Sequence, residues 1–135
     1  MDANVLLILP AHRRSTLLKQ LEGDRLQIFE ASNIHEAQRQ LSGQTSYDLL
    51  LTDSELPDGS WQDVWQFVQD SPRPCEMIVC PRCGDEELWA EVLQCGGYDL
   101  LVEPYEPNEV HRIIENALDS QYMRRFSRMA TAVRA

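Results

Sequence analysis

One carboxylate in this chain stands where a side chain could do chemistry. Asp53 follows the apolar run of "YDLLLTD" and precedes a turn at Pro57, Asp58 and Gly59. A carboxylate at the end of a buried strand can be a reactive group or can accept hydrogen bonds from the turn that follows it. The strand and turn alone favour the structural interpretation, so the surrounding elements have to decide.

Segments typical of strands and helices alternate along the chain around Asp53. Apolar runs predict strands at 4–9, 26–31, 47–53, 76–80 and 98–104, and helical spacing predicts helices at 13–22, 34–43, 60–69, 84–97 and from 107 onward. This order with short connections predicts an α/β fold whose parallel five-stranded sheet has helices on both faces. A site in such a sheet lies beyond the carboxyl ends of the strands, where Asp53 is expected.

Length and charge limit the classes of protein. A chain of 135 residues fits one compact domain, and its net charge of −10 argues against nucleic-acid binding by that domain. The apolar runs are too short to cross a membrane, and "MDAN" does not resemble a signal peptide, so we expect a cytoplasmic location. The last segment differs, since it carries four arginines and no acid. We predict a domain over 1–119 and a basic helical extension or tail over 120–135.

Apolar residues continue at helical spacing into the basic segment. They are Leu118, Tyr122, Phe126, Met129 and Val133. This spacing predicts an amphipathic helix that projects beyond the domain, although a frayed end with accidental periodicity is an equal alternative. Such a stripe would suit a dimer partner, an output protein or an anionic surface.

The four cysteines are Cys75, Cys80, Cys83 and Cys95. Without a secretory signal, free thiols are expected rather than disulfides. The "CPRC" run resembles half of a zinc ribbon, but a structural zinc needs about four ligands and the chain has no second C-x-x-C. A metal or thiol module using Cys80 and Cys83 therefore stays open only as an alternative.

Four features together resemble the receiver domain of two-component response regulators. They are "LLLTDSELPDG", "GGYDLL", "EPY" and the five-fold strand–helix repeat, and the resemblance covers about residues 4–118. It implies a flavodoxin-like (βα)5 three-layer sandwich with strand order 2-1-3-4-5. It also implies that Asp53 stands where the family accepts a phosphoryl group from a sensor histidine kinase, in a signalling domain rather than an enzyme.

The other residues that this resemblance implies are substituted in the present sequence. Leu9 and Pro10 occupy the acidic-pair positions, Pro81 or Cys80 the Thr/Ser position, Glu103 the lysine position and Leu100 the aromatic switch position. A divalent cation and a lysine would neutralise charge during phosphoryl transfer. Their replacement by apolar and acidic residues predicts that phosphorylation is difficult, the more so if Asp53 faces Glu103.

Two other arrangements could form around Asp53. Asp53, Glu55 and Glu103 could form a remade cation site, because carboxylates bind calcium or magnesium. Residues 12–14, "HRR", follow the first strand and could supply a fixed cation that pairs with Asp53 permanently. We favour the simpler interpretation, in which these three side chains are solvated at the start of a helix.

These observations predict a degenerate receiver-type domain in phosphorelay signalling that acts mainly through protein contacts. The resemblance implies that residues 85–118 form the face for a signalling partner or a homodimer. No cofactor is expected, and Mg²⁺ would be needed only if phosphorylation is retained. The alternatives are an ordinary receiver switch phosphorylated on Asp53 and the metal or thiol module.

Overall fold

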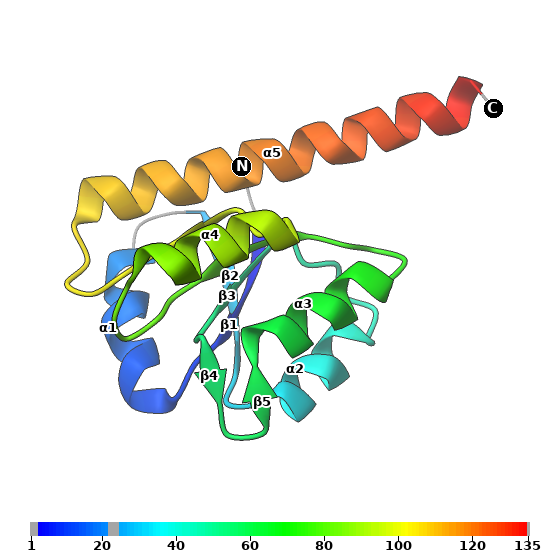
Figure 1. Ribbon diagram of the computed structural model, residues 1–135. Helices are drawn as coiled ribbons and strands as arrows, with labels where there is room; N and C mark the ends of the chain where they lie inside the picture. The colour runs from blue at the N-terminus through cyan, green and yellow to red at the C-terminus, as the bar shows by residue number, and fades with distance from the viewer. Residues whose placement is uncertain (1–2, 22–24, 135) are drawn as a thin grey trace.

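The computed structural model describes residues 3–21 and 25–134, and within them five parallel strands form one sheet (Figure 1). The strands are β1 (Ala3–Ile8), β2 (Leu26–Ala31), β3 (Leu49–Thr52), β6 (Glu76–Val79) and β7 (Asp99–Leu100). Their order is β2-β1-β3-β6-β7. Because β6 and β7 are the fourth and fifth predicted strands, the predicted order is confirmed.

Helices cover both faces of the sheet. They are α1 (Ala11–Leu21), α2 (Ile34–Leu41), α3 (Trp61–Asp70), α4 (Glu86–Cys95) and α5 (Pro107–Arg134). One apolar cluster joins the sheet to α2, α3 and α4, and a second joins it to α1 and α5. The central strands are buried on both sides, which explains why they read as continuous apolar runs rather than as alternating ones.

The turn after Asp53 is a small antiparallel hairpin that the sequence did not predict as strands. It consists of β4 (Glu55–Leu56) and β5 (Gly59–Ser60). Gly59 has a φ of 155°, and a Cβ there would lie 2.5 Å from a carboxylate oxygen of Asp63. A side chain at this position would therefore clash. The carboxylate of Asp58 accepts backbone hydrogen bonds from Ile34 and His35, which joins the hairpin to the start of α2.

The fifth strand is shorter than predicted. β7 contains two residues instead of the predicted 98–104. Leu101 still donates a backbone hydrogen bond to Val79, but Val102 is exposed and the chain then leaves the sheet. Pro104 offers no N–H for a ladder, so the predicted continuation of the strand was wrong.

α5 is one continuous helix of 28 residues, and its C-terminal part projects beyond the sheet (Figure 1). The predicted boundary between residues 119 and 120 falls inside this helix. Of the predicted apolar stripe, Leu118 is half-buried and Tyr122 and Phe126 are exposed, whereas the side chains of Met129 and Val133 lie outside the described part. Within the described residues, no helix is long and apolar enough to cross a membrane.

A cluster of polar contacts holds α5 where it passes the amino-terminal end of β6. Glu76 is 1% exposed, and its Oε1 lies 2.9 Å from Nε of Arg124 and accepts a hydrogen bond of 3.2 Å from Ser120. Gln121 donates to the carbonyl of Pro74 over 3.2 Å. We call Glu76, Ser120, Gln121 and Arg124 the α5 clasp.

Candidate functional site

The backbone of Asp53 is fixed at the carboxyl edge of the sheet. Its N–H donates to the carbonyl of Ile8 at the end of β1 over 2.9 Å, and the hydroxyl of Thr52 donates to its carbonyl over 3.0 Å. The side chain of Asp53 is only 2% exposed. A buried carboxylate is unstable unless it has a partner, so the structure must supply one.

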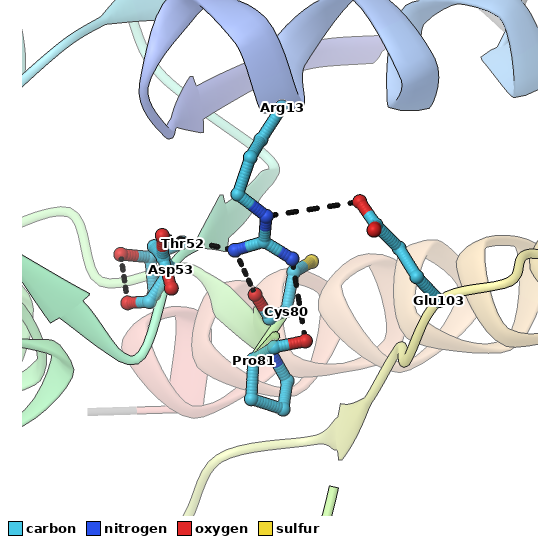
Figure 2. A network of polar contacts seen from close by, with 6 residues as sticks. All are labelled: Arg13, Thr52, Asp53, Cys80, Pro81 and Glu103. Carbon is cyan, nitrogen blue, oxygen red and sulfur yellow. Dashed lines mark hydrogen bonds and ion pairs between the residues drawn. The ribbon is translucent and has the colours of Figure 1, made fainter. Parts of the chain in front are cut away.

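That partner is Arg13, in the first turn of α1. Its Nη1 lies 2.9 Å from Oδ2 of Asp53, and the Arg13 side chain is 5% exposed (Figure 2). The contact is an ion pair, because Oδ2 has no aligned hydrogen-bond donor among the described residues. The N–H groups of Arg13 and Arg14 donate to the carbonyl of Pro10, which starts α1 at the edge of the sheet and directs Arg13 inward.

The same guanidinium also holds the segment that follows β6. Nη1 donates to the carbonyl of Cys80 over 2.9 Å, and Nη2 donates to the carbonyl of Pro81 over 3.2 Å (Figure 2). Arginine suits this position because its planar group presents several donors in fixed directions. Arg13 therefore links three segments: the start of α1, the end of β3 and the connection between β6 and α4.

Glu103 lies on the other side of the guanidinium. Its Oε1 is 3.7 Å from Nε of Arg13, and its side chain is 38% exposed. The expectation that Asp53 would face Glu103 directly is wrong, because the Arg13 cation lies between the two carboxylates (Figure 2). The cation beside Asp53 is thus an arginine from the first turn of α1.

The preferred interpretation of residues 12–14 is wrong for one of the three. His12 is exposed and Arg14 is half-buried, as expected of a helix start, but Arg13 is buried against Asp53. The alternative of a fixed cation is the one that the structure shows. One signal in the sequence pointed to it, since Arg13 follows the end of β1 by only five residues and lies in the first turn of α1, within reach of a neighbouring strand end.

The electrostatics of the site follow from this burial. Burial alone would lower the pKa of Arg13, but the contact with Asp53 and its charge outweigh this effect, so the pKa is raised and the guanidinium stays charged. Burial raises the pKa of the Cys80 thiol to about 12. Burial also raises the pKa of the Tyr105 phenol. At neutral pH the thiol and the phenol are therefore neutral, and the charges at the site are those of Arg13, Asp53 and Glu103.

The substituted positions carry no side chains that could restore the missing groups. Leu9 and Leu100 are buried in the apolar core, and Pro10 contributes only its carbonyl, which caps α1. Cys80 is fully buried, and both Cys80 and Pro81 act through backbone carbonyls. The assignment of these positions to family roles stays a prediction.

The carboxylates do not form a cation site in the described part of the chain. No group of three or more His, Cys, Asp or Glu side chains is placed there to hold a metal ion, and Glu55 points to solvent from β4. The donor set around Asp53 does not fit Mg²⁺: its neighbours Leu9 and Pro10 offer no side-chain oxygen, and the Arg13 cation already lies against the carboxylate.

The cysteines are free thiols, as expected. Cys80 is buried and Cys83 is exposed, so the two thiols of "CPRC" do not share one environment. Nothing in the described residues brings a third ligand to them.

Comparison with known proteins identifies the family. The family model described as "Response regulator receiver domain" matches residues 11–115. The chain belongs to this family. The receiver chain is 30% identical to the response regulator protein PilR of Pseudomonas aeruginosa over 94 residues, and 30% identical to the transcriptional regulatory protein SrrA of Staphylococcus aureus over 111 residues. These matches cover 70% and 82% of the chain.

The relatives are longer proteins, and the solved structures agree in fold. The chain spans 21% of PilR and 45% of SrrA. The receiver domain of the sensor histidine kinase PA1611 from Pseudomonas aeruginosa, solved with a magnesium ion in its active-site cleft, superposes with a TM-score of 0.74 at 18% identity. This match covers 88% of the present chain and 99% of that one. The receiver fold is therefore shared.

Proposed function

We propose that this receiver domain works in two-component signalling through protein contacts, in one state that does not depend on phosphorylation of Asp53. The observation that supports this proposal is the enclosed ion pair between Arg13 and Asp53, 2.9 Å apart and 5% and 2% exposed. A cation built into the fold neutralises Asp53 without a bound metal. It also holds the segment after β6, so no ligand is needed to order that segment.

Two physical obstacles oppose phosphoryl transfer to Asp53. The attacking oxygen must be reached by the phosphodonor, but the carboxylate is buried beneath Arg13. The developing negative charge also needs more than one cation, and the donor set does not fit Mg²⁺. A ligand can switch a domain only if it binds one conformation more tightly than the other. If neither a phosphoryl group nor Mg²⁺ binds here, no such free-energy difference is available to change the state of the domain.

A second candidate is the ordinary switch, in which Asp53 is phosphorylated. One observation favours it: the guanidinium of Arg13 lies where it could neutralise a phosphoryl group as well as a carboxylate. This candidate requires Arg13 to move aside and then bind the product. The first candidate requires no such movement.

The contacts by which the domain would signal lie on the side of α4 and β7. Residues 85–118 remain the proposed face for a histidine kinase or another signalling protein. α4 supports this, because Val92 is the only residue of this helix that is fully buried in the described structure. A helix that is so exposed and yet carries Trp89 and Leu93 has apolar surface available for a partner.

The experiment is intact-mass analysis of the chain after incubation with acetyl phosphate and MgCl₂. We expect no phosphoryl adduct on the wild-type chain, under conditions that phosphorylate a receiver domain that retains the acidic pair. Asp53→Asn is the control for adducts elsewhere. An adduct on the wild type that Asp53→Asn abolishes would establish the ordinary switch instead.

A further inference from the structure

The projecting part of α5 exposes a cluster of large apolar side chains. Tyr122, Met123 and Phe126 are between 55% and 60% exposed. They lie within five consecutive residues, so they form one apolar surface rather than the scattered hydrophobic residues found on every protein. We call residues 122–134 the α5 extension.

Two members of the α5 clasp fix which side of the helix carries this surface. Gln121 is buried and donates to the carbonyl of Pro74, and Nε of Arg124 lies 2.9 Å from Oε1 of Glu76. The side of α5 that holds these two residues therefore faces the sheet. Successive residues of an α-helix are turned by about 100°, which puts the three exposed apolar side chains on the opposite side. The domain that carries them does not cover them.

The α5 extension is basic, although the chain as a whole is acidic. It contains four arginines and no acid, and all 22 acids of the chain precede residue 120. The extension is about 18 Å long at a rise of about 1.5 Å per residue, whereas charges in about 0.1 M salt are screened beyond about 10 Å. Because it projects beyond the sheet (Figure 1), most of it is screened from the acidic domain. It should therefore attract an anionic partner despite the net charge of −10.

The width of the apolar surface indicates what kind of anionic partner fits. Tyr122 and Met123 are turned by about 100° from each other, and Phe126 lies between these two directions. The seam by which a helix packs on a single partner helix is narrower, whereas an arc of about 100° fits a helix whose side enters an extended apolar medium. A nucleic acid would bind the arginines but leave the apolar side chains in water. The interface of a lipid bilayer offers both anionic headgroups and acyl chains.

We propose that the α5 extension binds along the surface of an anionic lipid bilayer, with its apolar side at the boundary between headgroups and acyl chains. Each arginine near such a surface strengthens binding about fivefold, and the apolar side chains add a contact that charge alone does not supply. The inference goes beyond the proposed function, since it adds lipid to the partners of the chain and does not involve Asp53.

The part of α5 that precedes the extension keeps the domain itself off the bilayer. On the same outward side of the helix this part carries only polar side chains, all of them exposed: Arg112, Glu115, Asn116 and Asp119. Two of the four are acids, which an anionic surface repels. Contact with lipid therefore begins at Tyr122.

The test is flotation of the full chain with two kinds of vesicle, one of phosphatidylcholine alone and one of equal parts of phosphatidylcholine and phosphatidylglycerol. We expect the chain to bind the mixed vesicles more tightly than the neutral ones by about tenfold or more in about 0.1 M NaCl. Raising NaCl to about 0.5 M should weaken this binding about tenfold, because exposed charges are screened.

Three variants separate the apolar contact from the charge. Phe126→Ser removes an apolar side chain without adding charge and should weaken binding to the mixed vesicles about tenfold. Leu93→Ser makes a similar change at an exposed position of α4 and should bind as the wild type does. Arg125→Gln combined with Arg128→Gln should weaken binding about 25-fold, at about fivefold for each arginine. Circular dichroism shows whether each variant is folded.

Fluorescence quenching shows which part of the chain enters the lipid. The tryptophan of Phe126→Trp should be quenched by phosphatidylcholine with brominated acyl chains in the mixed vesicles. Asn116→Trp, about 15 Å further back along α5, should not be quenched. The native tryptophans lie in α3 and α4, so the emission of the wild type should also stay unchanged.

Other outcomes would overturn the proposal. One is a wild type that stays unbound at about 1 mM mixed lipid, where a surface anchor with an association constant of about 10⁴ M⁻¹ is mostly bound. If Phe126→Ser binds as tightly as the wild type, the chain adheres through charge alone. Quenching of the wild type would mean that the face of α4 lies on the bilayer instead. A wild type that is oligomeric without lipid, while Phe126→Ser is monomeric, would show that protein rather than lipid covers the apolar surface.

Discussion

Two buried carboxylates lie at opposite ends of the sheet, and each is paired with an arginine from a helix. Asp53 follows β3 and pairs with Arg13 of α1, and Glu76 begins β6 and pairs with Arg124 of α5, both over 2.9 Å. The arginines differ. Arg13 is 5% exposed and also donates to two carbonyls, whereas Arg124 is 47% exposed.

The difference in exposure decides what each pair can do. Water cannot replace an enclosed guanidinium, so Asp53 has a permanent partner, and the loss of either group leaves a bare charge in the interior. Water and salt can reach the Arg124 guanidinium, which makes its contact with Glu76 weaker and easier to release. The first pair therefore fixes the site, and the second fixes the direction of α5 less firmly.

Arg13→Ala should have the largest effect. It leaves the carboxylate of Asp53 buried and unpaired and also removes two hydrogen bonds to the connection between β6 and α4. We expect the free energy of unfolding to fall by about 3–5 kcal/mol, measured by urea denaturation. Arg14→Ala, at the neighbouring half-buried position, is the control and should cost less than about 1 kcal/mol. Equal losses for the two variants would show that the ion pair is not what holds the site.

Asp53→Asn in the Arg13→Ala background should restore part of that loss. The double variant no longer buries an unpaired carboxylate, so it should be about 1–3 kcal/mol more stable than Arg13→Ala alone. Urea denaturation of the wild type, both single variants and the double variant gives the coupling energy. Additive effects would mean that Arg13 stabilises the fold through the carbonyls of Cys80 and Pro81 rather than through Asp53.

The fold could be predicted from the sequence because its signals are local and repeated. Continuous apolar runs predicted the strands, and glycines and prolines predicted the connections, so the strand order and both helical layers are confirmed. The β4–β5 hairpin and the early end of β7 were missed. In the hairpin, the pairing of Glu55 with Ser60 depends on the geometry of a turn that contains Gly59.

The site was predicted only in part because side-chain direction depends on tertiary packing. The position of Asp53 follows from the strand that precedes it, but nothing local tells whether Arg13 or Arg14 turns inward. The same holds for Glu76 and Arg124, 48 residues apart in numbering, whose contact arises only where α5 crosses the end of β6. A glutamate within an apolar strand was the one available signal, since buried charges require partners.

Arg124→Ala should have a smaller effect than Arg13→Ala. Glu76 keeps the hydroxyl of Ser120 and gains access to water, so we expect a loss of about 1 kcal/mol in the free energy of unfolding. High salt should reduce this loss, because the wild-type pair is partly exposed. Arg112→Ala, exposed on the same helix, is the matched control. A loss as large as that of Arg13→Ala would contradict the contrast between the two pairs.

Glu76→Gln should have the smallest effect, visible as a change with pH. Burial raises the pKa of Glu76, and Arg124 and Ser120 oppose this only in part. The carboxyl group of Glu76 therefore binds its proton more tightly in the folded protein than in the unfolded chain. Its contribution to stability is fully present below the ordinary pKa of a glutamate and is lost as pH rises through the raised pKa of the folded state. Glutamine does not titrate, so the stability of Glu76→Gln relative to the wild type should improve between about pH 4 and about pH 7 in urea denaturation.

Glu115→Gln, an exposed carboxylate on α5, controls for the loss of one charge. If the relative stability instead worsened as pH rose, the ion pair with Arg124 would outweigh burial, and the two ends of the sheet would be held by pairs of the same kind.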